Sequence, residues 1–324
     1  MTSELLAHVF PFDPTYGYRD EDLLNVTAPP EPDDLAEFWQ WAYRQTIDRP
    51  PRVTSRRIPC ADPALDLFEV EFDSGDGLRI GGWLTVPRNQ RPRRGVVLSH
   101  GYGGREGPDL VIPGPSAIVM QPCIRGFNRS ATSGLPDQAA EHVLHGIESR
   151  ETYIHLGCVM DHWAAATALL ELFPDIANAL HFIGGSFGGG IGAMALAWDP
   201  RFHAASLKVP SFGNHPLRVT LPCTGSGEAV RRYHRRHPEV LNVLRYFDAA
   251  TLAQRITIPT HFACARFDPA VPPPGQFAVC NAAAGPKRLT WLRAGHFEHS
   301  GAQADEIRLF EDRRDWFERC TPTR

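Results

Sequence analysis

The chain lacks any apolar run close to the roughly 20 residues that a membrane-spanning helix needs. Its first residues, 1–8, contain neither a basic region nor a long apolar core, so no secretory signal is visible. The seven cysteines are widely spaced, and no two of them form a Cys-x-x-Cys pair. We therefore expect no membrane partner, and a cytoplasmic protein whose thiols are reduced and mostly buried.

A strong excess of charge is also missing. The 33 basic and 37 acidic residues leave a formal net charge of -4, which gives no electrostatic reason to expect a nucleic acid as partner. No spacing of His, Cys or Asp is typical of a metal site, and no dinucleotide or P-loop fingerprint is present, so we expect no metal and no cofactor. The basic run 231–237 is interpreted as the solvated face of a helical insertion rather than as a site for an acidic partner.

The chain is nevertheless rich enough in apolar residues, at 43%, to bury a substantial core. Apolar strands alternate with helices, including a long helix over about 152–172 and a last one over about 302–318. This alternation predicts an α/β fold with a mainly parallel central sheet and helices on both faces. Two strands, 67–72 and 78–86, are expected to form an antiparallel hairpin at one edge of that sheet.

We expect one α/β domain over residues 1–324. It would carry an N-terminal helical extension over about 1–50, irregular up to residue 30, and a helical insertion over about 212–255. The insertion would cover the carboxyl end of the sheet. Because crossovers between parallel strands are short and right-handed, the loops after the strands should all lie on this one rim.

The strongest chemical signal is the segment Gly184-Gly185-Ser186-Phe187-Gly188, which follows an apolar strand and precedes a helix. Strand, Gly-x-Ser-x-Gly and helix together form the nucleophile-elbow arrangement. A serine on so tight a turn needs neighbours with almost no side chain, and its hydroxyl is then exposed near the first amides of the helix. The pattern predicts that Ser186 is a nucleophile; the alternative is a glycine-rich turn that lets a helix pack closely on a sheet.

A serine hydroxyl needs a base, and the base needs an orienting carboxylate. In this fold class the chain order is serine, acid, histidine. Asp268 follows a strand that ends near residue 265, and His296 follows a strand that ends near residue 292. Both should lie on the rim that carries Ser186, so the three residues predict a catalytic triad.

The acid and the base of the predicted triad each have an alternative. His299 is the rival base, but Gly295 lets the chain turn sharply at the strand end and favours His296. Asp268 could instead be a solvated turn residue before a proline, and Asp248 is a rival acid. Asp248 follows a helix rather than a strand, so we expect it to cap a helix.

An oxyanion hole needs two N–H donors aimed at one point. One should be the backbone amide of Phe187, the residue after the nucleophile. The other should come from the loop 101–104, where the backbone amide of Tyr102 is the expected donor.

These pieces, with further motifs in a fixed order, resemble carbohydrate esterase family 7, the acetyl xylan esterases and cephalosporin C deacetylases. The resemblance covers roughly 30–318. Its further motifs are Pro32-Asp33-Asp34-Leu35-Ala36-Glu37-Phe38-Trp39, Gly77-Leu78-Arg79-Ile80-Gly81-Gly82-Trp83-Leu84, His100-Gly101-Tyr102-Gly103-Gly104, Arg125-Gly126, Gly146-Ile147, Glu151-Thr152-Tyr153, Leu244-Arg245-Tyr246-Phe247-Asp248, Pro272-Pro273, Phe277-Ala278 and Ala284-Gly285-Pro286-Lys287.

The resemblance implies an α/β-hydrolase fold and a serine esterase that works without metal or cofactor. It implies removal of acetyl groups from small substrates such as xylo-oligosaccharides or cephalosporin C, in an intracellular homo-oligomer, typically a hexamer. Carried over by position, Ser186 is the nucleophile, Asp268 the acid and His296 the base, with Tyr102 and Phe187 as backbone donors.

The chain departs from the family at two glutamines. The residue after the nucleophile is Phe187 instead of Gln, and the Arg-Gly-Gln-Gly loop has become Arg125-Gly126-Phe127-Asn128. Arg125 and Phe127 are the expected substrate-pocket residues. Because two amides are replaced by phenyl rings, we expect a drier pocket that favours apolar esters over sugars. Near the C-terminus the family has Glu directly after its histidine, whereas here Phe297 intervenes, which keeps His299 open as the base.

Two other functions stay open. A serine peptidase of the prolyl-oligopeptidase type often has an aromatic residue after its serine, but no propeller-length region precedes the hydrolase core here. A non-catalytic homologue that only binds small molecules is the second, and the intact set of triad residues argues against it.

Overall fold

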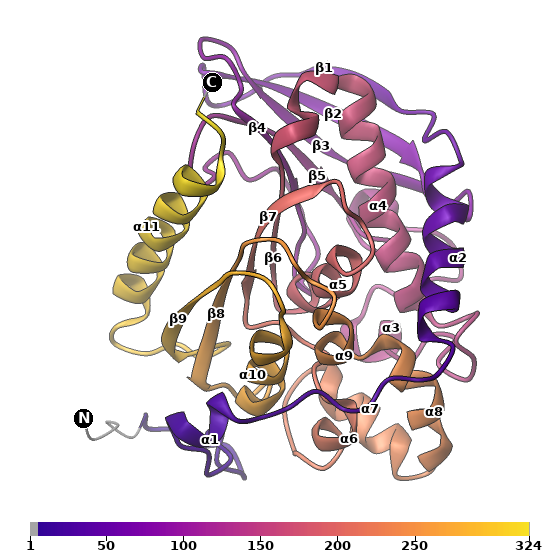
Figure 1. Cartoon of the computed structure of the whole chain (residues 1–324), viewed down its shortest axis with the longest axis vertical. Helices are drawn as coiled ribbons and strands as arrows, with labels where there is room; N and C mark the ends of the chain where they lie inside the picture. Colours follow the sequence, from indigo (N-terminus) through magenta and orange to yellow (C-terminus); the bar gives the residue numbers. More distant parts are fainter. Residues whose placement is uncertain (1–5, 324) are drawn as a thin grey trace.

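A mixed sheet runs through the computed structural model, which describes residues 6–323 (Figure 1). The strand order is β1-β2-β3-β5-β4-β6-β7-β8-β9. Strands β4 to β9 are mutually parallel, and β1, β2 and β3 are antiparallel. The prediction of a mainly parallel sheet is confirmed. The strands are β1 (Thr54–Ile58), β2 (Leu65–Asp73), β3 (Arg79–Pro87), β4 (Arg94–Leu98), β5 (Ala117–Pro122), β6 (Leu180–Gly185), β7 (Phe202–Lys208), β8 (Thr260–Phe267) and β9 (Lys287–Ala294).

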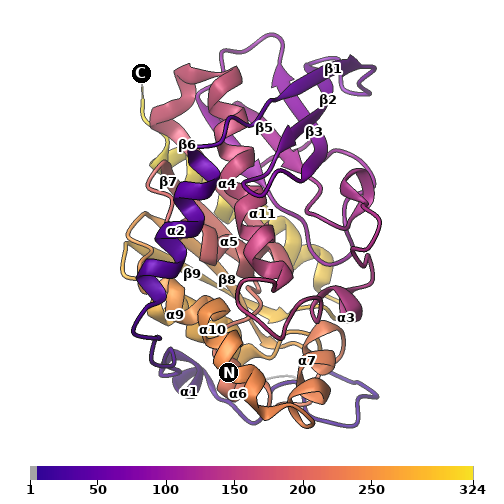
Figure 2. The ribbon, with the colours of Figure 1, turned by 90° about the vertical axis from the view of Figure 1, so that its right-hand side faces the viewer.

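Helices cover both faces of the sheet unequally. Figure 2 shows α2, α4, α5, α9 and α10 in front of the sheet and α11 behind it. The α-helices are α1 (Asp20–Leu24), α2 (Leu35–Ile47), α3 (Ala139–His142), α4 (Ile154–Leu172), α5 (Phe187–Leu196), α6 (His215–Arg218), α7 (Ser226–His234), α8 (Leu241–Leu244), α9 (Ala249–Ala253), α10 (Pro273–Ala282) and α11 (Ala302–Cys320). None of the described helices is both long enough and apolar enough to span a bilayer.

The larger face is held by aromatic packing. Trp39 of α2 is fully buried, meets Trp163 of α4 edge to face at 6.0 Å, and donates its indole N–H to the carbonyl of Tyr246. On the opposite face, Phe317 of α11 is fully buried and stacks on His181 of β6 at 5.2 Å. The first contact joins two helices of one layer, and the second holds α11 against the sheet.

Elements that escaped the sequence prediction include two in the first 60 residues. The first is β1, whose residues are mostly exposed and polar, so that no apolar alternation marks it. It forms by pairing with β2, and Arg56–Glu69 and Arg57–Asp66 ion pairs join the two strands. The hairpin of β2 and β3 is therefore not the edge of the sheet, because β1 lies outside it. The second is α1, which forms within the segment expected to be irregular.

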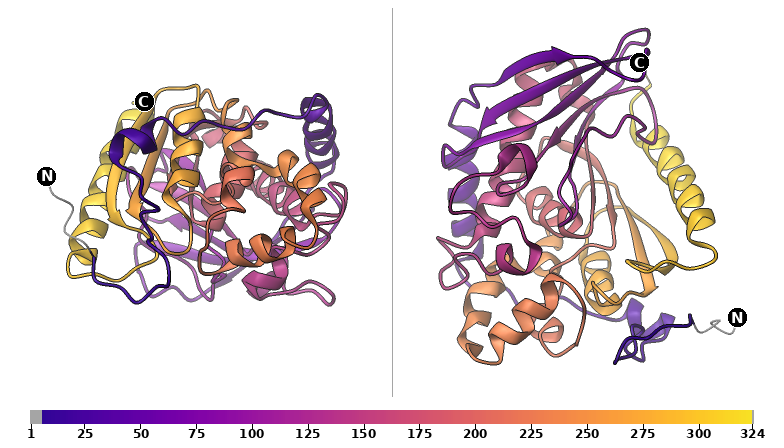
Figure 3. Two further views of the ribbon diagram at one scale, coloured as in Figure 1. Left: turned by 90° about the horizontal axis from the view of Figure 1, so that it is seen from below. Right: turned by 180° about the vertical axis from the view of Figure 1, so that it is seen from behind.

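Between β7 and β8 the chain forms α6, α7, α8 and α9, with short 3-10 turns between them. Helices α6, α7 and α8 lie at the carboxyl end of the parallel strands, which the N-terminal segment also crosses, whereas α9 packs against α5 and α10 (Figure 3). Asp248 begins α9, and its carboxylate accepts hydrogen bonds from the amides of Ala250 and Thr251 at 3.0 and 3.1 Å. The prediction that Asp248 caps a helix is confirmed.

A buried ion pair links the segment after β5 to α4, and the turn between β2 and β3 also contacts it. The Asp161 carboxylate is fully buried, and Arg125 donates to it from Nε and Nη2, at 3.1 and 2.7 Å. Ser74 donates to the same carboxylate, and Asp76 also pairs with Arg125. Burial alone would lower the pKa of Arg125, but these carboxylates raise it, so the guanidinium is charged.

We expect Arg125→Met to lower the free energy of unfolding by about 3–5 kcal/mol, because it leaves the Asp161 charge buried without its partner. The double change Arg125→Met with Asp161→Leu should recover part of that loss, since no charge then stays buried. Urea denaturation of the three proteins measures both effects. A loss below about 1 kcal/mol in the single variant would contradict this role for the pair.

Candidate active site

Ser186 lies at the junction of β6 and α5 in a backbone conformation that non-glycine residues rarely adopt, with φ 54° and ψ -119°. Its amide donates to the carbonyl of Lys208 at 2.8 Å, and its own carbonyl accepts from Ser211 and from two glycine amides of α5. Backbone hydrogen bonds on both sides therefore hold the strained residue, and the strand turns into the helix within one residue.

The glycines around Ser186 are required by close backbone contacts. A Cβ on Gly184 would lie 2.4 Å from the carbonyl oxygen of Gly188, and one on Gly188 would lie 2.5 Å from that of His100. Both distances are shorter than side chains tolerate. A larger residue at 184 would force β6 and α5 apart, and one at 188 would force α5 away from the segment after β4. The alternative interpretation was a glycine-rich turn that lets a helix pack closely on a sheet. It is compatible with the nucleophile, because the same close contacts expose the Ser186 hydroxyl.

The structure brings together Ser186, Asp268 and His296. Nε2 of His296 lies 2.9 Å from the Ser186 hydroxyl, and Nδ1 lies 2.9 Å from Oδ2 of Asp268. Because the carboxylate only accepts, Nδ1 of His296 carries the proton and Nε2 is free to accept the proton of the serine. The side chains come from the ends of β6, β8 and β9, three strands that are parallel.

The Asp268 carboxylate is fully buried and is oriented by three donors besides the histidine. The amides of Ala270 and Val271 donate to Oδ1 at 2.9 Å each, and Nε2 of Gln276 donates to Oδ2 at 3.0 Å. Gln276 also accepts from the Ala265 amide through Oε1. Gln276 could not be predicted as a site residue, because its only signal in the sequence is a polar residue within the apolar helix α10.

The surroundings of His296 change the pKa of its imidazole. Burial alone would lower the pKa of its imidazole, but the hydrogen bond to Asp268 and the charge of that carboxylate raise it above the ordinary value. Lys208 acts in the opposite direction. His296 also has a positive φ of 47°, and a Cβ on the preceding Gly295 would lie 2.3 Å from Oδ2 of Asp268. The turn that the glycine permits brings the imidazole against the carboxylate.

His299, the rival base, is turned toward α11. Its Nε2 lies 3.6 Å from the Asp305 carboxylate, and its Nδ1 accepts from the amide of Gly301. The structure therefore places His296 against Ser186 and holds His299 elsewhere on the wall of the same cavity.

The two residues expected to form an oxyanion hole lie in contact. Phe187 is the first residue of α5, so its amide has no partner within the helix. The loop that carries Tyr102 approaches the nucleophile, since a Cβ on Gly101 would lie 3.8 Å from that of Ser186. The rings of Tyr102 and Phe187 stack with centroids 4.1 Å apart, which ties the loop to the helix that follows the nucleophile.

The expected substrate-pocket residues lie elsewhere. Arg125 is engaged in the buried ion pair with Asp161, and Phe127 is 3% exposed in an aromatic cluster around Phe187 and Tyr102. Neither lines the cavity beside Ser186. The expectation of a dry pocket walled by two phenyl rings is corrected, because both rings are used in packing.

A cavity of about 520 Å³ opens beside Ser186 and His296. Its wall carries many charged and polar groups, among them an ion pair between Lys208 and Glu306. Its other lining residues are Gly101, Gly185, Val209, Leu292, Ala294, Gly295, Phe297, Glu298, His299, Ala302 and Asp305. Within residues 6–323 no group of three or more His, Cys, Asp or Glu side chains is arranged to hold a metal ion.

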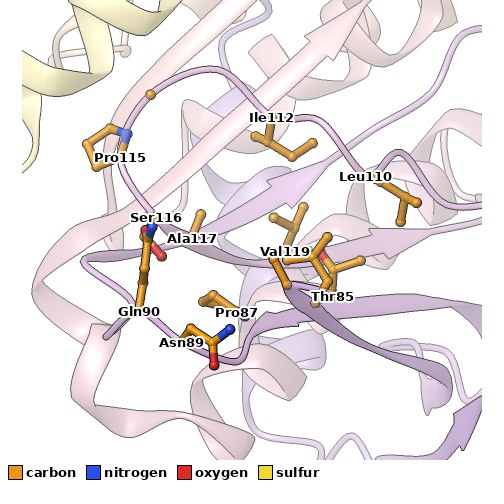
Figure 4. Close-up of a pocket in the computed structure, with 13 residues that line it drawn as sticks. Thr85, Pro87, Asn89, Gln90, Leu110, Ile112, Pro115, Ser116, Ala117 and Val119 are labelled. Atoms are coloured by element: carbon orange, nitrogen blue, oxygen red, sulfur yellow. The ribbon is translucent and has the colours of Figure 1, made fainter. Parts of the chain in front are cut away.

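A second cavity of about 220 Å³, between the 89–90 and 110–116 segments, lies far from this chemistry (Figure 4). Ala117, the first residue of β5, lines it, so it is found at the amino end of the parallel strands. It shares no lining residue with the cavity at Ser186.

We expect Gln276→Met to reduce the rate of Ser186-dependent hydrolysis, by roughly tenfold, because one donor to the Asp268 carboxylate is lost. The thioether fills a similar volume but donates no hydrogen bond. Steady-state kinetics should show the loss in kcat with little change in KM. Gln276→Met kinetics equal to those of the wild type would show that the backbone donors alone position the acid.

Relatives of this chain among known proteins also point to an esterase. A family model described as acetyl xylan esterase (AXE1) matches residues 19–313. Acetyl esterase Axe7A of Xylanibacter ruminicola is 23% identical over 288 residues, which make up 84% of this chain. The chain spans 64% of that relative's length.

Solved structures show the same fold. The acetyl xylan esterase from Paenibacillus sp. R4 superposes with a TM-score of 0.75 at 23% identity, covering 91% of this chain and 100% of that one. Acetyl xylan esterase 1 from Thermoanaerobacterium sp. JW/SL YS485 gives 0.77 at 18% identity, covering 93% and 99%. The predicted α/β-hydrolase fold is thereby confirmed, and, because the family model spans most of its length, the chain belongs to the acetyl xylan esterase family.

Proposed function

We propose that the protein is a serine carboxylic ester hydrolase that removes acetyl groups from small acetylated substrates. The observation that carries the proposal is the continuous chain of hydrogen bonds from Ser186 through His296 to Asp268. Membership of the acetyl xylan esterase family supports the acetyl group as the part removed. The cytoplasmic location and the hexamer that the family resemblance implies stay predictions.

The geometry defines the steps of the reaction. The Ser186 oxygen attacks the ester carbonyl while Nε2 of His296 accepts its proton, and the amides of Phe187 and Tyr102 stabilise the oxyanion. The tetrahedral intermediate then collapses, and His296 returns the proton to the departing alcohol. A water molecule, deprotonated by His296, attacks the acetyl-serine and releases acetate, which restores the Ser186 hydroxyl.

The wall of the cavity favours a polar alcohol as the leaving group. Lys208, Glu298, His299 and Glu306 present donors and acceptors beside Ser186, and Phe297 adds one aromatic face. Hydroxyl-rich alcohols such as acetylated xylo-oligosaccharides can hydrogen-bond to such a wall. A cephalosporin-like acetate is the other small substrate that we propose.

The proposal is tested by acetate release from acetylated xylo-oligosaccharides and p-nitrophenyl acetate, and by arylamine release from an amino-acid anilide. We expect ester hydrolysis to fall by about 10⁴-fold or more in Ser186→Ala and in His296→Ala, because the triad works as a unit. His299→Ala should keep activity within about tenfold of the wild type. Anilide turnover above ester turnover would indicate a peptidase, and full ester turnover in Ser186→Ala would refute the proposal.

The charges around His296 predict a pH dependence. The base must be neutral to accept the serine proton, and its pKa lies above the ordinary value of about 6.5, so kcat/KM should fall as the pH drops through that raised pKa. The Lys208 charge lowers this pKa, so Lys208→Gln should move the acid limb to higher pH. Measuring kcat/KM between pH 5 and 9 locates the limb in both proteins, and an unmoved or downward-shifted limb in the variant would contradict the assignment.

A further inference from the structure

His155, the second residue of α4, is a fully buried histidine that the catalytic triad does not use. Its Nε2 lies 3.2 Å from the hydroxyl of Tyr102, the residue whose backbone amide is the expected oxyanion donor after β4. Burial lowers the pKa of this imidazole well below its ordinary value and raises the pKa of the Tyr102 hydroxyl well above its usual range. The hydrogen bond therefore joins two neutral groups at physiological pH.

Stability alone does not explain this buried hydrogen bond. The other ring nitrogen of His155, Nδ1, is buried and has no hydrogen-bond partner within residues 6–323. A buried polar atom left unpaired costs at least as much free energy as a typical neutral hydrogen bond contributes. An apolar side chain of similar volume would fill the core as well, so the retained imidazole points to a role in the site.

Tyr102 carries the only side chain of the loop 101–104, because the other three residues are glycines. Its ring stacks on Phe187 with centroids 4.1 Å apart, and Phe212 meets it edge to face at 6.4 Å. Stacking sets the plane of the ring. The bond to His155 at the far end of the ring sets how far along that plane it lies, and so where the Tyr102 backbone lies.

His155 belongs to the same rigid layer as the other expected oxyanion donor. Helix α4 is 19 residues long and packs against α5 (Figure 1). Trp163 of α4 donates its indole N–H to the carbonyl of Ala195 in α5 at 2.9 Å. Phe187, whose amide is that other donor, is the first residue of α5. The contact between His155 and Tyr102 therefore sets the donor on the loop relative to the donor on the helix.

The imidazole of His155 also meets the segment that holds the nucleophile. Its ring centroid lies 4.4 Å from that of Phe212. The amide of the preceding residue, Ser211, donates to the carbonyl of Ser186 at 3.1 Å. One buried side chain thus contacts both the loop with an expected oxyanion donor and the segment that fixes the backbone of the nucleophile.

We propose that His155 is a positioning residue of the oxyanion hole, which holds the amide of Tyr102 where it converges with that of Phe187 on the tetrahedral oxyanion. The inference rests on the proposed esterase activity and deepens it. An N–H donor stabilises the transition state only when it points at the developing charge. A small displacement of the loop should therefore lower kcat, while substrate binding, which precedes that charge, changes little.

The test removes the hydrogen bond from each side, in Tyr102→Phe and in His155→Leu, and from both sides at once. With p-nitrophenyl acetate we expect each single variant to lose about tenfold in kcat with KM little changed, because the donor is displaced rather than removed. The double variant should lose no more than the weaker single variant, since the same bond is broken in all three. His155→Gln can still bond the Tyr102 hydroxyl and should keep kcat within about threefold of the wild type.

Tyr43→Phe is the matched control, because the Tyr43 hydroxyl also donates across 3.2 Å, to Asp199, and does not line the cavity at Ser186. It should keep the wild-type kcat. Urea denaturation should show the double variant to be no less stable than the wild type, because apolar groups replace a buried polar pair. Wild-type kcat in the two single variants, or a loss no greater than in Tyr43→Phe, would overturn the proposal.

A tetrahedral adduct separates this inference from the proposed activity. The Ser186 oxygen adds to the carbonyl of benzyl trifluoromethyl ketone while His296 takes the serine proton, so the adduct holds an oxyanion without turnover. Its dissociation constant, measured by fluorine NMR, should rise about tenfold in Tyr102→Phe and His155→Leu and stay unchanged in Tyr43→Phe. If a wild type that hydrolyses no acetyl ester bound the ketone in this pattern, the proposed activity would fail and the positioning role would stand. Equal affinity in all four proteins would overturn the positioning role.

Discussion

The close approach of β6 and α5 at Ser186 is the constraint on which the rest of the site depends. A side chain on Gly184 would meet α5, one on Gly188 would meet the segment after β4, and backbone hydrogen bonds hold Ser186 at a positive φ. The strain at one residue is compensated by the packing of the whole sheet on the helices. In return, the hydroxyl lies beside the first amides of α5, where negative charge is stabilised.

The acid and the base of the triad are positioned through the burial of the Asp268 carboxylate. Asp268 is fully buried, yet its carboxylate is satisfied by two backbone amides, a glutamine and the histidine. A carboxylate oriented in this way has little freedom to move, so it fixes both the tautomer and the direction of the His296 ring. Gln276 is thus a positioning residue, and the aromatic stack of Tyr102 on Phe187 is its counterpart on the oxyanion side.

The features that could be predicted from sequence are those that sterics or chain order dictate. The tight turn at Ser186 demands glycines, and the loops after parallel strands must share one rim, so the sequence indicates the fold and the residues that meet there. The roles of β1, Gln276 and Arg125 could not be predicted, because each depends on which groups from distant segments lie opposite. The expectation that Phe127 and Phe187 line a pocket is wrong for the same reason. The sequence shows that phenylalanine replaces glutamine, but it does not show in which direction the ring points.

The central claim is that the folded chain makes the Ser186 hydroxyl unusually nucleophilic. Incubation with diisopropyl fluorophosphate followed by peptide mass spectrometry tests it directly, because the reagent forms an oxygen–phosphorus bond with an activated serine and releases fluoride. We predict one adduct per chain, on the peptide that contains Ser186, and none in Ser186→Ala or in urea-unfolded protein. An unmodified Ser186, or equal labelling of the Ser186→Ala variant, would contradict the claim.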